Sequence, residues 1–344
     1  MQIQSLAIIL ISYQRPMLLK KALESLISAI DNARNVNQQF SFQVYLCING
    51  SDDVSYQLSL ELQTRSVMHI EHNAKPLTPA AARNQLLQSV KSDFVFFMDD
   101  DVILPNDIFI HFRHFQNLYP KVDLWGGPNL TPPESLSQQK DCGWLVSQPF
   151  IVGPIAQRYV LSHRDISTGE QFNLMLCNLF VRSTLLQNGF EHFFKTAEEN
   201  ELIYRLQNKK CSMLSSPKLF VWHERRKTYT EFIKQIFYYG YGRGQLLNRV
   251  SLVKQKLFLL VPVLCICFLF LAFYFPQTIF SVVLSWLAFV QLMYLIEYRE
   301  LNAKILILPL LMYAAYVFGL ARGFIQMIFW NPKTKILSPE MNKH

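Results

Sequence analysis

The pattern of apolar and polar positions divides the chain into two parts. In the first 250 residues, short apolar runs that predict strands alternate with amphipathic stretches that predict helices. The strands are expected at 6–12, 42–48, 67–70 and 93–98, and the helices between them at 16–30 and 80–90. Alternation at this spacing is typical of βαβ units, so we expect an α/β fold with a twisted, mainly parallel sheet.

The pattern weakens after residue 105. Glycine and proline gather at 126–128 and 131–133, and residues 128–170 are predicted to form long, partly mobile loops. Later periodic stretches predict a helix at 198–207, a strand at 218–222 and a helix at 230–247. We therefore expect the α/β domain to occupy residues 1–250.

The remaining sequence is mostly apolar. Stretches at 257–275 and 278–296 contain no charged residue, and a third at 305–329 contains only Arg322. Each is long enough to cross the core of a bilayer. The sequence therefore predicts a membrane region with two to three transmembrane helices at 251–330, followed by a polar tail at 331–344.

Basic residues on both sides of this region bear on its topology. Arg249, Lys254 and Lys256 precede the first stretch, which favours a cytoplasmic position for the α/β domain. The tail is also basic, which conflicts with an odd number of spans. The third stretch is therefore either a span or a tilted, re-entrant or interfacial helix. We expect a multi-pass protein of the inner (cytoplasmic) membrane.

Charge and cysteine content exclude several classes of protein. The formal net charge is +8, but no dense basic run is present, which argues against a nucleic-acid partner. The basic residues before the apolar region fit an anionic membrane face or a diphosphate instead. Six cysteines without a C-x-x-C pair indicate reduced, structural thiols in a cytosolic domain. The N-terminus lacks the cationic lead-in and cleavage site of a signal peptide.

The most informative stretch is the apolar run at 94–98, which leads directly into Asp99, Asp100 and Asp101. In open α/β sheets, ligands bind at the carboxyl ends of the strands. Three adjacent carboxylates there repel one another unless a cation neutralises them, and oxygen ligands favour ions such as Mg²⁺ or Mn²⁺. The stretch thus indicates a metal site for a nucleotide with a diphosphate. Alternatively, Asp100 and Asp101 cap a helix that starts near Pro105.

Several segments together resemble the family 2 glycosyltransferases, which have the GT-A fold. The run 8–16 is similar to the first strand and nucleotide-binding turn of that family. Residues 79–84 and 96–101 resemble its Ala-Arg-Asn helix and its DxD element. The resemblance extends over about residues 5–245. It implies a Rossmann-like GT-A domain that binds a nucleotide-sugar.

The resemblance implies roles for two acids of the triplet and leaves two alternatives for Asp100. Asp99 would contact the ribose or the sugar, and Asp101 would bind the metal that holds the diphosphate. Asp100 would either support the metal ligands or cap the following helix. A metal suits this chemistry because the leaving nucleoside diphosphate develops charge in the transition state.

The segment 197–202 aligns with the Glu-Asp-x-Asp-Leu segment of the family, whose second acid is the general base. In this chain the position is occupied by Glu199 instead of aspartate. Glu198 is the alternative candidate for the general base. A carboxylate suits the role because the acceptor hydroxyl loses its proton as it attacks the anomeric carbon. The alternative is an acidic helix start favoured by the helix dipole.

Further candidate ligands are basic or polar. By the same resemblance, His223 would complete the metal site as a second ligand beside Asp101, unless it is a structural histidine. Arg225 and Arg243 match the geometry of phosphate oxygens, although lipid headgroups are an alternative partner for both. The complete set of expected nucleotide-sugar ligands is Ser12, Tyr13, Arg15, Asn49, Asp52, Arg83, Asn84, Asp99, Asp100, Arg225 and Arg243.

Two departures from the family pattern restrict the expected function. The aspartate that often precedes the turn after the second strand is replaced by Ile48, so uracil recognition is not implied, although Asp52 or Asp53 could contribute. The Gln-x-x-Arg-Trp element of processive synthases is missing, because Gln235 is followed by an apolar and aromatic run. This argues for the transfer of one sugar per event.

We therefore expect a metal-dependent, inverting glycosyltransferase, with inversion implied by the resemblance. It would move one sugar from a nucleotide-sugar to a lipid-linked or other glycan acceptor at the cytoplasmic membrane face, in surface polysaccharide biosynthesis. Its expected partners are the donor, the lipid-linked saccharide and membrane lipids. The alternatives are a processive polysaccharide synthase and a catalytically silent nucleotide-sugar-binding partner in an assembly complex.

Overall fold

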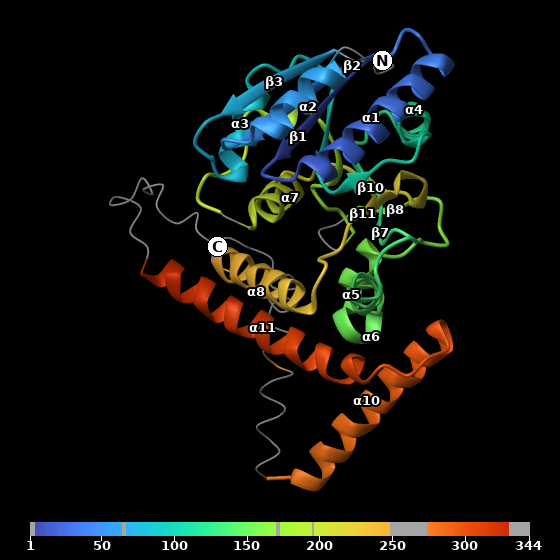
Figure 1. Ribbon diagram of the computed structural model, residues 1–344, viewed down its shortest axis with the longest axis vertical. Coiled ribbons are helices and arrows are strands. Elements are labelled where there is room, and N and C mark those ends of the chain that lie inside the picture. The colour runs from blue at the N-terminus through green and yellow to red at the C-terminus, as the bar shows by residue number, and fades with distance from the viewer. Residues whose placement is uncertain are drawn as a thin grey trace. The chain divides into compact units, whose positions relative to one another are not determined.

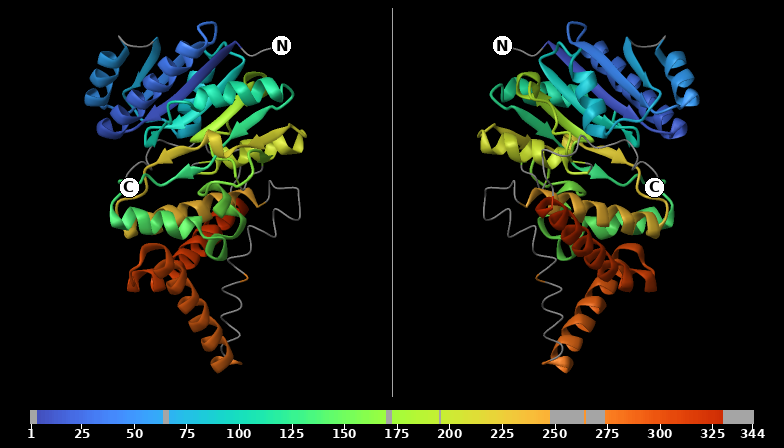
Figure 2. Two further views of the ribbon diagram at one scale, coloured as in Figure 1. Left: turned by 90° about the vertical axis from the view of Figure 1, so that its right-hand side faces the viewer. Right: turned by 90° about the vertical axis from the view of Figure 1, so that its left-hand side faces the viewer.

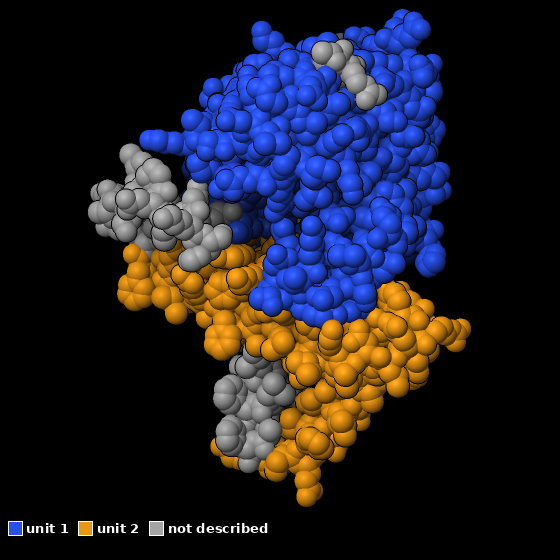
Figure 3. Space-filling view, in the orientation of Figure 1, with its two compact units in different colours: residues 1–232 blue, residues 233–344 orange. Residues whose placement is uncertain are grey.

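The computed structural model describes residues 4–63, 67–169, 173–194, 196–247, 264 and 274–329. The chain divides into two compact units, Met1–Phe232 and Ile233–His344 (Figure 3). The division falls within a helix, because α8 (Tyr229–Leu246) begins in the first unit and belongs for most of its length to the second.

The first unit contains an eight-stranded sheet with the order β3-β2-β1-β4-β9-β6-β10-β8 (Figure 1). The strands β3, β2, β1 and β4 are parallel to one another, whereas β9 runs antiparallel to β4 and β6. The α/β fold with a mostly parallel sheet is thus confirmed. The strands are β1 (Ser5–Ser12), β2 (Ser41–Asn49), β3 (Met68–Asn73), β4 (Phe94–Asp99), β6 (Leu124–Gly126), β8 (Ser167–Thr168), β9 (Asn178–Arg182) and β10 (Met213–Ser215).

Helices cover both faces of this sheet (Figure 2). Alternate side chains of a strand point to opposite faces. On one face, Phe97 packs in a cluster with apolar residues of α3 and α7. On the other, Phe96 lies against Phe109 of α4 and stacks on Phe180 of β9. Burial on both faces explains why the run 94–98 contains no polar residue. The principal helices are α1 (Pro16–Val36), α2 (Asp53–Gln63), α3 (Pro79–Leu87), α4 (Ile108–Leu118) and α7 (Glu198–Asn208).

The region 128–170 does not form the long loops that the sequence predicts. It contains β7 (Asn129–Leu130), α5 (Ser137–Ser147), α6 (Pro149–Val152) and the 3₁₀ helix η1 (Gly153–Arg158), followed by β8. The buried side of α5 includes Gln139 and Asp141. Gln139 donates a hydrogen bond to the backbone oxygen of Arg225, and Asp141 accepts one from the hydroxyl of Tyr229. Because residues on its buried side are polar, the hydrophobic periodicity of the sequence does not predict this helix.

Other elements differ from the prediction in extent. Helix α1 continues six residues beyond the expected end at 30, and α2 follows β2 where only a turn was expected. Helix α3 begins as predicted, because Thr78 Oγ1 accepts a 3.3 Å hydrogen bond from the Ala81 backbone nitrogen. The strand expected at 218–222 is divided into η3 (Pro217–Leu219) and β11 (Val221–His223). Another 3₁₀ helix, η2 (Ser183–Leu186), follows β9.

A second, three-stranded sheet has the order β5-β11-β7. Strand β5 (Val102–Ile103) directly follows the acid triplet. Because β5 and β11 are antiparallel, His223 lies opposite Val102. The backbone nitrogen of Glu224 also donates a 2.9 Å hydrogen bond to the carbonyl oxygen of Asp101. This small sheet therefore brings His223 to the triplet from more than 120 positions away.

The second unit contains the helices α10 (Pro276–Tyr298) and α11 (Ala303–Ile328) and most of α8. Both α10 and α11 are long and apolar enough to cross a membrane. In the most apolar 18-residue stretch of each helix, only 17% of α10 and 39% of α11 is buried. These helices correspond to the predicted stretches 278–296 and 305–329. The predicted stretch at 257–275 falls almost entirely outside the described residues, and so does the tail at 331–344.

Helices α8 and α11 cross with their backbones in close contact. Each helix has a pair of glycines four residues apart at the crossing, namely Gly240 and Gly244 on α8 and Gly319 and Gly323 on α11. A Cβ atom at any of the four would overlap backbone atoms of the opposite helix. Small residues at this spacing allow helices to approach closely in membrane proteins.

The crossing predicts a large effect of one added side chain. Gly319→Val would place carbon atoms on the carbonyl of Phe237 and should destabilise the protein by about 1–3 kcal/mol. Thermal unfolding of the detergent-solubilised protein measures this effect. The matched control is Ala321→Val on the exposed side of α11, which should leave the midpoint nearly unchanged. Equal midpoints for the two variants would contradict the close crossing.

Candidate active site

The acid triplet lies at the carboxyl end of β4, where the parallel neighbour β1 also ends. Residues that follow β1 therefore reach residues that follow β4. Ser12 Oγ donates a 2.8 Å hydrogen bond to Asp100 Oδ2. Arg15 Nη1 lies 3.3 Å from Asp100 Oδ1 and 3.1 Å from Asp101 Oδ2. Two of the three carboxylates are thus balanced by one guanidinium group.

The environment gives these two neighbouring carboxyl groups different proton affinities. Burial, reinforced by the charge of Asp101, raises the pKa of Asp100 to about 6 against the opposing effects of Arg15 and Ser12. Burial also opposes ionisation of Asp101. There the charge and hydrogen bond of His223, together with Arg15, outweigh burial and hold the pKa of Asp101 well below its usual range. Asp101 is therefore the permanent anion of the pair.

His223 joins the triplet from β11. Its Nε2 lies 3.1 Å from Asp101 Oδ1, and its Nδ1 lies 3.3 Å from Nη1 of Arg225. Arg225 also donates hydrogen bonds to Thr131 Oγ1 (3.0 Å) and to the carbonyl oxygen of Asn129 (2.5 Å). The guanidinium of Arg225 thus connects the histidine ring to β7 and the loop after it. In this arrangement Arg225 supports His223.

Arg83 links two carboxylates from different elements. From α3, its Nη2 lies 3.3 Å from Asp99 Oδ1 and its Nη1 lies 2.9 Å from Glu198 Oε1. The guanidinium also lies 5.8 Å from the ring centroid of Phe190. Burial raises the pKa of Asp99 and of Glu198, and the charge of Arg83 opposes both shifts. Arg83 therefore connects the triplet to α7.

Glu199, the expected general base, lies in the first turn of α7. Its Oε2 accepts a 3.1 Å hydrogen bond from the backbone nitrogen of Leu176, and its Oε1 lies 3.7 Å from Nη1 of Arg158. After burial and Asp101, the charge of Glu199 further raises the pKa of Asp99. The charge of the candidate base therefore acts on the first carboxylate of the triplet.

The sequence reasoning missed Cys177, Arg158 and Asn129 as site residues. Cys177 immediately precedes β9, whose first residue Asn178 pairs with Met98. The thiol therefore reaches the same end of β4 as Asp99. An apolar run at 179–181 could have indicated β9 as a strand, but neither its antiparallel direction nor its register is evident from the sequence.

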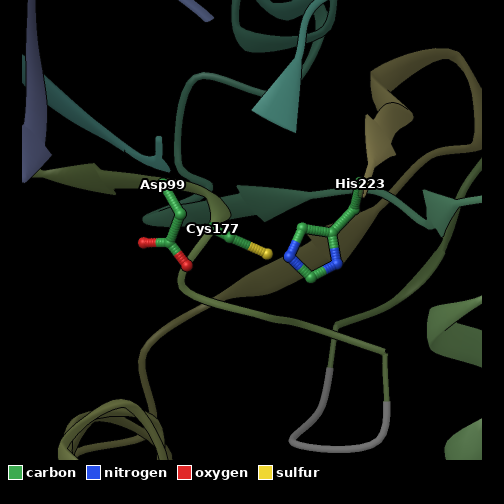
Figure 4. Close-up of side chains that lie close together, drawn as sticks. All are labelled: Asp99, Cys177 and His223. Atoms are coloured by element: carbon green, nitrogen blue, oxygen red, sulfur yellow. The ribbon is translucent and has the colours of Figure 1, made fainter. Parts of the chain in front are cut away.

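One group of side chains could hold a metal ion. Asp99, Cys177 and His223 each offer a ligand atom, and these atoms lie within 4.8 Å of one another (Figure 4). The figure shows the three side chains converging on one point from separate elements. Asp101 adds an oxygen 3.1 Å from the imidazole. The donor set therefore fits a divalent cation.

Some predicted ligands have other partners in the structure. Asn49 exchanges hydrogen bonds with the backbone of Leu77, at 2.8 and 2.9 Å. Asp52 accepts hydrogen bonds from the backbone nitrogen and the hydroxyl of Ser55 at the start of α2. The amide of Asn84 is bonded to the backbone of Phe190. Tyr13 is 43% exposed after β1, and Arg243 lies on the part of α8 that belongs to the second unit.

The part of the chain that carries the acid triplet also matches a known protein family. Residues 7–117 match the model of the family described as Glycosyl transferase family 2. The matched segment includes the acid triplet. No curated protein matches the sequence. In this segment the chain is similar to family 2 glycosyltransferases.

Solved structures resemble this chain over most of its length. A mannosyltransferase from Pyrobaculum calidifontis, in complex with GDP-Man and Mn²⁺, has a TM-score of 0.56 at 12% identity over 94% of this chain and 87% of that chain. Residues 1–349 of S. aureus TarS, in complex with UDP-GlcNAc, have a TM-score of 0.50 at 14% identity, with 94% and 91% covered. Identities this low show the fold, which is GT-A.

The raised pKa of Asp100 predicts a pH-dependent stability. The folded protein binds a proton at Asp100 more tightly than the unfolded chain, so this stabilisation is complete below pH 3.8 and is lost as the pH rises through about 6. Relative to Asp100→Asn, the wild type should lose up to about 3 kcal/mol between pH 4 and pH 7. Chemical unfolding in a chelator-containing buffer measures the difference.

The control for this measurement is Asp107→Asn, an exposed carboxylate paired with His111. Its stability should follow that of the wild type across the same pH range. A constant difference between wild type and Asp100→Asn at every pH would contradict the raised pKa.

Proposed function

We propose that this protein is a membrane-anchored, inverting glycosyltransferase that transfers one sugar from a nucleotide-sugar to a lipid-linked saccharide at the cytoplasmic face of the inner membrane. The observation that carries the proposal is the position of Glu199, a carboxylate oriented by a backbone N–H, in the same electrostatic environment as the acid triplet. A nucleotide-sugar transfer needs both a base and a site for the diphosphate.

The proton transfer follows from the position of Glu199. The acceptor hydroxyl gives its proton to this carboxylate while its oxygen forms a bond to the anomeric carbon. The bond between that carbon and the diphosphate oxygen breaks on the opposite side, and the nucleoside diphosphate leaves with the electron pair. Leu176 and Arg158 hold the two carboxylate oxygens of Glu199, which fixes the direction from which the hydroxyl is deprotonated.

Positive charges near the triplet would stabilise the departing nucleoside diphosphate. Arg15 is 37% exposed and is the more accessible of the guanidinium groups paired with the triplet, since Arg83 is 10% exposed. A divalent cation such as Mg²⁺ or Mn²⁺, held by Asp101 and His223, would neutralise charge on the diphosphate. Asp99, whose side chain is 40% exposed, is the proposed contact to the ribose or the sugar.

The apolar helices support a lipid-linked acceptor. In solution, α10 and α11 would leave most of their apolar surface exposed. Arg243 on α8 carries a buried Nη1 that finds no hydrogen-bond acceptor among the described residues. A guanidinium of this kind suits the phosphate of a lipid headgroup or of a polyprenyl diphosphate. A role in surface polysaccharide biosynthesis would follow from such an acceptor.

Glu199→Gln tests the general base. Removing the base should lower the rate of sugar transfer by about 10²–10⁴-fold while binding of the nucleotide-sugar persists. The assay measures transfer from a panel of nucleotide-sugars to membrane-derived acceptors. Glu201→Gln, on the same helix and paired with Arg205, is the matched control and should retain near-normal transfer. Near-normal transfer by Glu199→Gln would show that another group is the base.

Asp101→Ala tests whether the triplet serves catalysis. The variant should lose metal-dependent hydrolysis of the nucleotide-sugar, because the anion that carries the cation is removed. Asp31→Ala, an exposed residue of α1, provides the control and should hydrolyse the donor like the wild type. If the wild type binds nucleotide-sugars tightly and turns none over on any acceptor, the protein is a silent binding partner instead.

A further inference from the structure

Cys177 occupies an unusual position for a cysteine in this site. It lies beside the end of β4, only 3% exposed, and it directly precedes β9. Burial, followed by the charges of Asp99, Glu199 and Asp101, raises the pKa of the Cys177 thiol well above its ordinary value. Without a cation, this residue is therefore a protonated thiol rather than a reactive thiolate.

The surroundings of the sulfur resemble those of a metal ligand. Sγ of Cys177, a carboxylate oxygen of Asp99 and a ring nitrogen of His223 lie within 4.8 Å of one another (Figure 4). Three ligands of one ion cannot all lie opposite one another: with bond lengths near 2.3 Å for sulfur and 2.1 Å for nitrogen, they are about 3.6–3.8 Å apart. The three side chains would therefore move closer together, by up to about 1 Å, to bind the same cation.

A neighbouring amide orients the sulfur. Asn129 Nδ2 donates hydrogen bonds to Cys177 Sγ at 3.2 Å and to Met175 Sδ at 2.9 Å. The carbonyl of the same asparagine accepts a hydrogen bond from Arg225, which also contacts His223. The sulfur and the imidazole thus share one supporting network. Such outer partners fix the orientation of metal ligands.

We propose that Cys177 is a further protein ligand of the divalent cation held by Asp101 and His223, and that its sulfur shifts the preference of the site from Mg²⁺ toward Co²⁺ and Zn²⁺. One oxygen of Asp99 would join the same cation, which leaves the other oxygen for the ribose or the sugar. When the cation binds, the S–H bond breaks, the sulfur keeps the electron pair and binds the metal, and the proton passes to the buffer. Thiolate ligands favour such ions, whereas Mg²⁺ favours oxygen. The inference rests on the proposed function only for the use of the bound cation in sugar transfer.

Co²⁺ binding to the full-length, detergent-solubilised protein tests the ligand directly. A thiolate bound to Co²⁺ gives a sulfur-to-metal charge-transfer absorption in the near ultraviolet, which oxygen and nitrogen ligands do not give. The wild type should show this band in proportion to bound Co²⁺, and Cys177→Ser should lose it. Retention of the band in Cys177→Ser, or saturable Co²⁺ binding by the wild type without the band, would overturn the proposal.

Two further variants separate loss of the ligand from loss of the fold. Cys211→Ser, a cysteine outside the cluster, should keep the band. Cys177→Ala serves if the serine variant does not fold, and its thermal midpoint is measured alongside. The proposal requires both folded Cys177 variants to lack the band.

Competition between ions tests the selectivity. Cys177→Ser should weaken Co²⁺ binding by roughly tenfold or more, as removal of a supporting partner alone often does. Its Mg²⁺ binding, measured by displacement of Co²⁺, should change much less. An equal loss for both ions would overturn the selectivity. Because these measurements need no sugar donor, they remain informative even if the proposed transfer reaction is wrong.

Discussion

The site depends on the neutralisation of three consecutive carboxylates at the end of a buried strand. The apolar run before them fixes their position, since it is buried on both faces of the sheet and cannot slide without exposing a side chain or burying a charge. Their mutual repulsion must then be offset locally. The structure meets this requirement with Arg15 after β1, Arg83 on α3 and His223 on β11, each from a different part of the chain.

This electrostatic requirement also organises the residues around the triplet. Arg83 joins Asp99 to Glu198, and the next residue, Glu199, is the candidate base. His223 is supported in turn by Arg225, which also holds the backbone of β7. The charges that would attract a cation and a diphosphate are therefore the same ones that connect α3, α7 and the small sheet. A substitution of one of these charged residues would therefore affect both ligand binding and the packing of these elements.

Much of this could be predicted from the sequence, because local patterns determine the parallel strands, the start of α3 and the acid triplet. The family resemblance implied that His223 joins Asp101 as a metal ligand, and that role stays a prediction. The structure places the two side chains 3.1 Å apart because β5 pairs with β11. Helix α5 was hidden by buried polar side chains, and Cys177 depends on the register of an antiparallel strand. Such long-range pairings leave little trace in one sequence. The side-chain partners of Asn84 and Asp52 were likewise not evident.

The glycine crossing between α8 and α11 has a consequence for protein engineering. Its contacts are made by main-chain atoms, so the fit depends on the absence of side chains at four positions on two helices that are far apart in sequence. Neither helix can be exchanged alone for a segment of similar hydropathy. A chimaera in which another apolar helix replaces α11 must also receive a compatible α8, so the two helices have to be exchanged together.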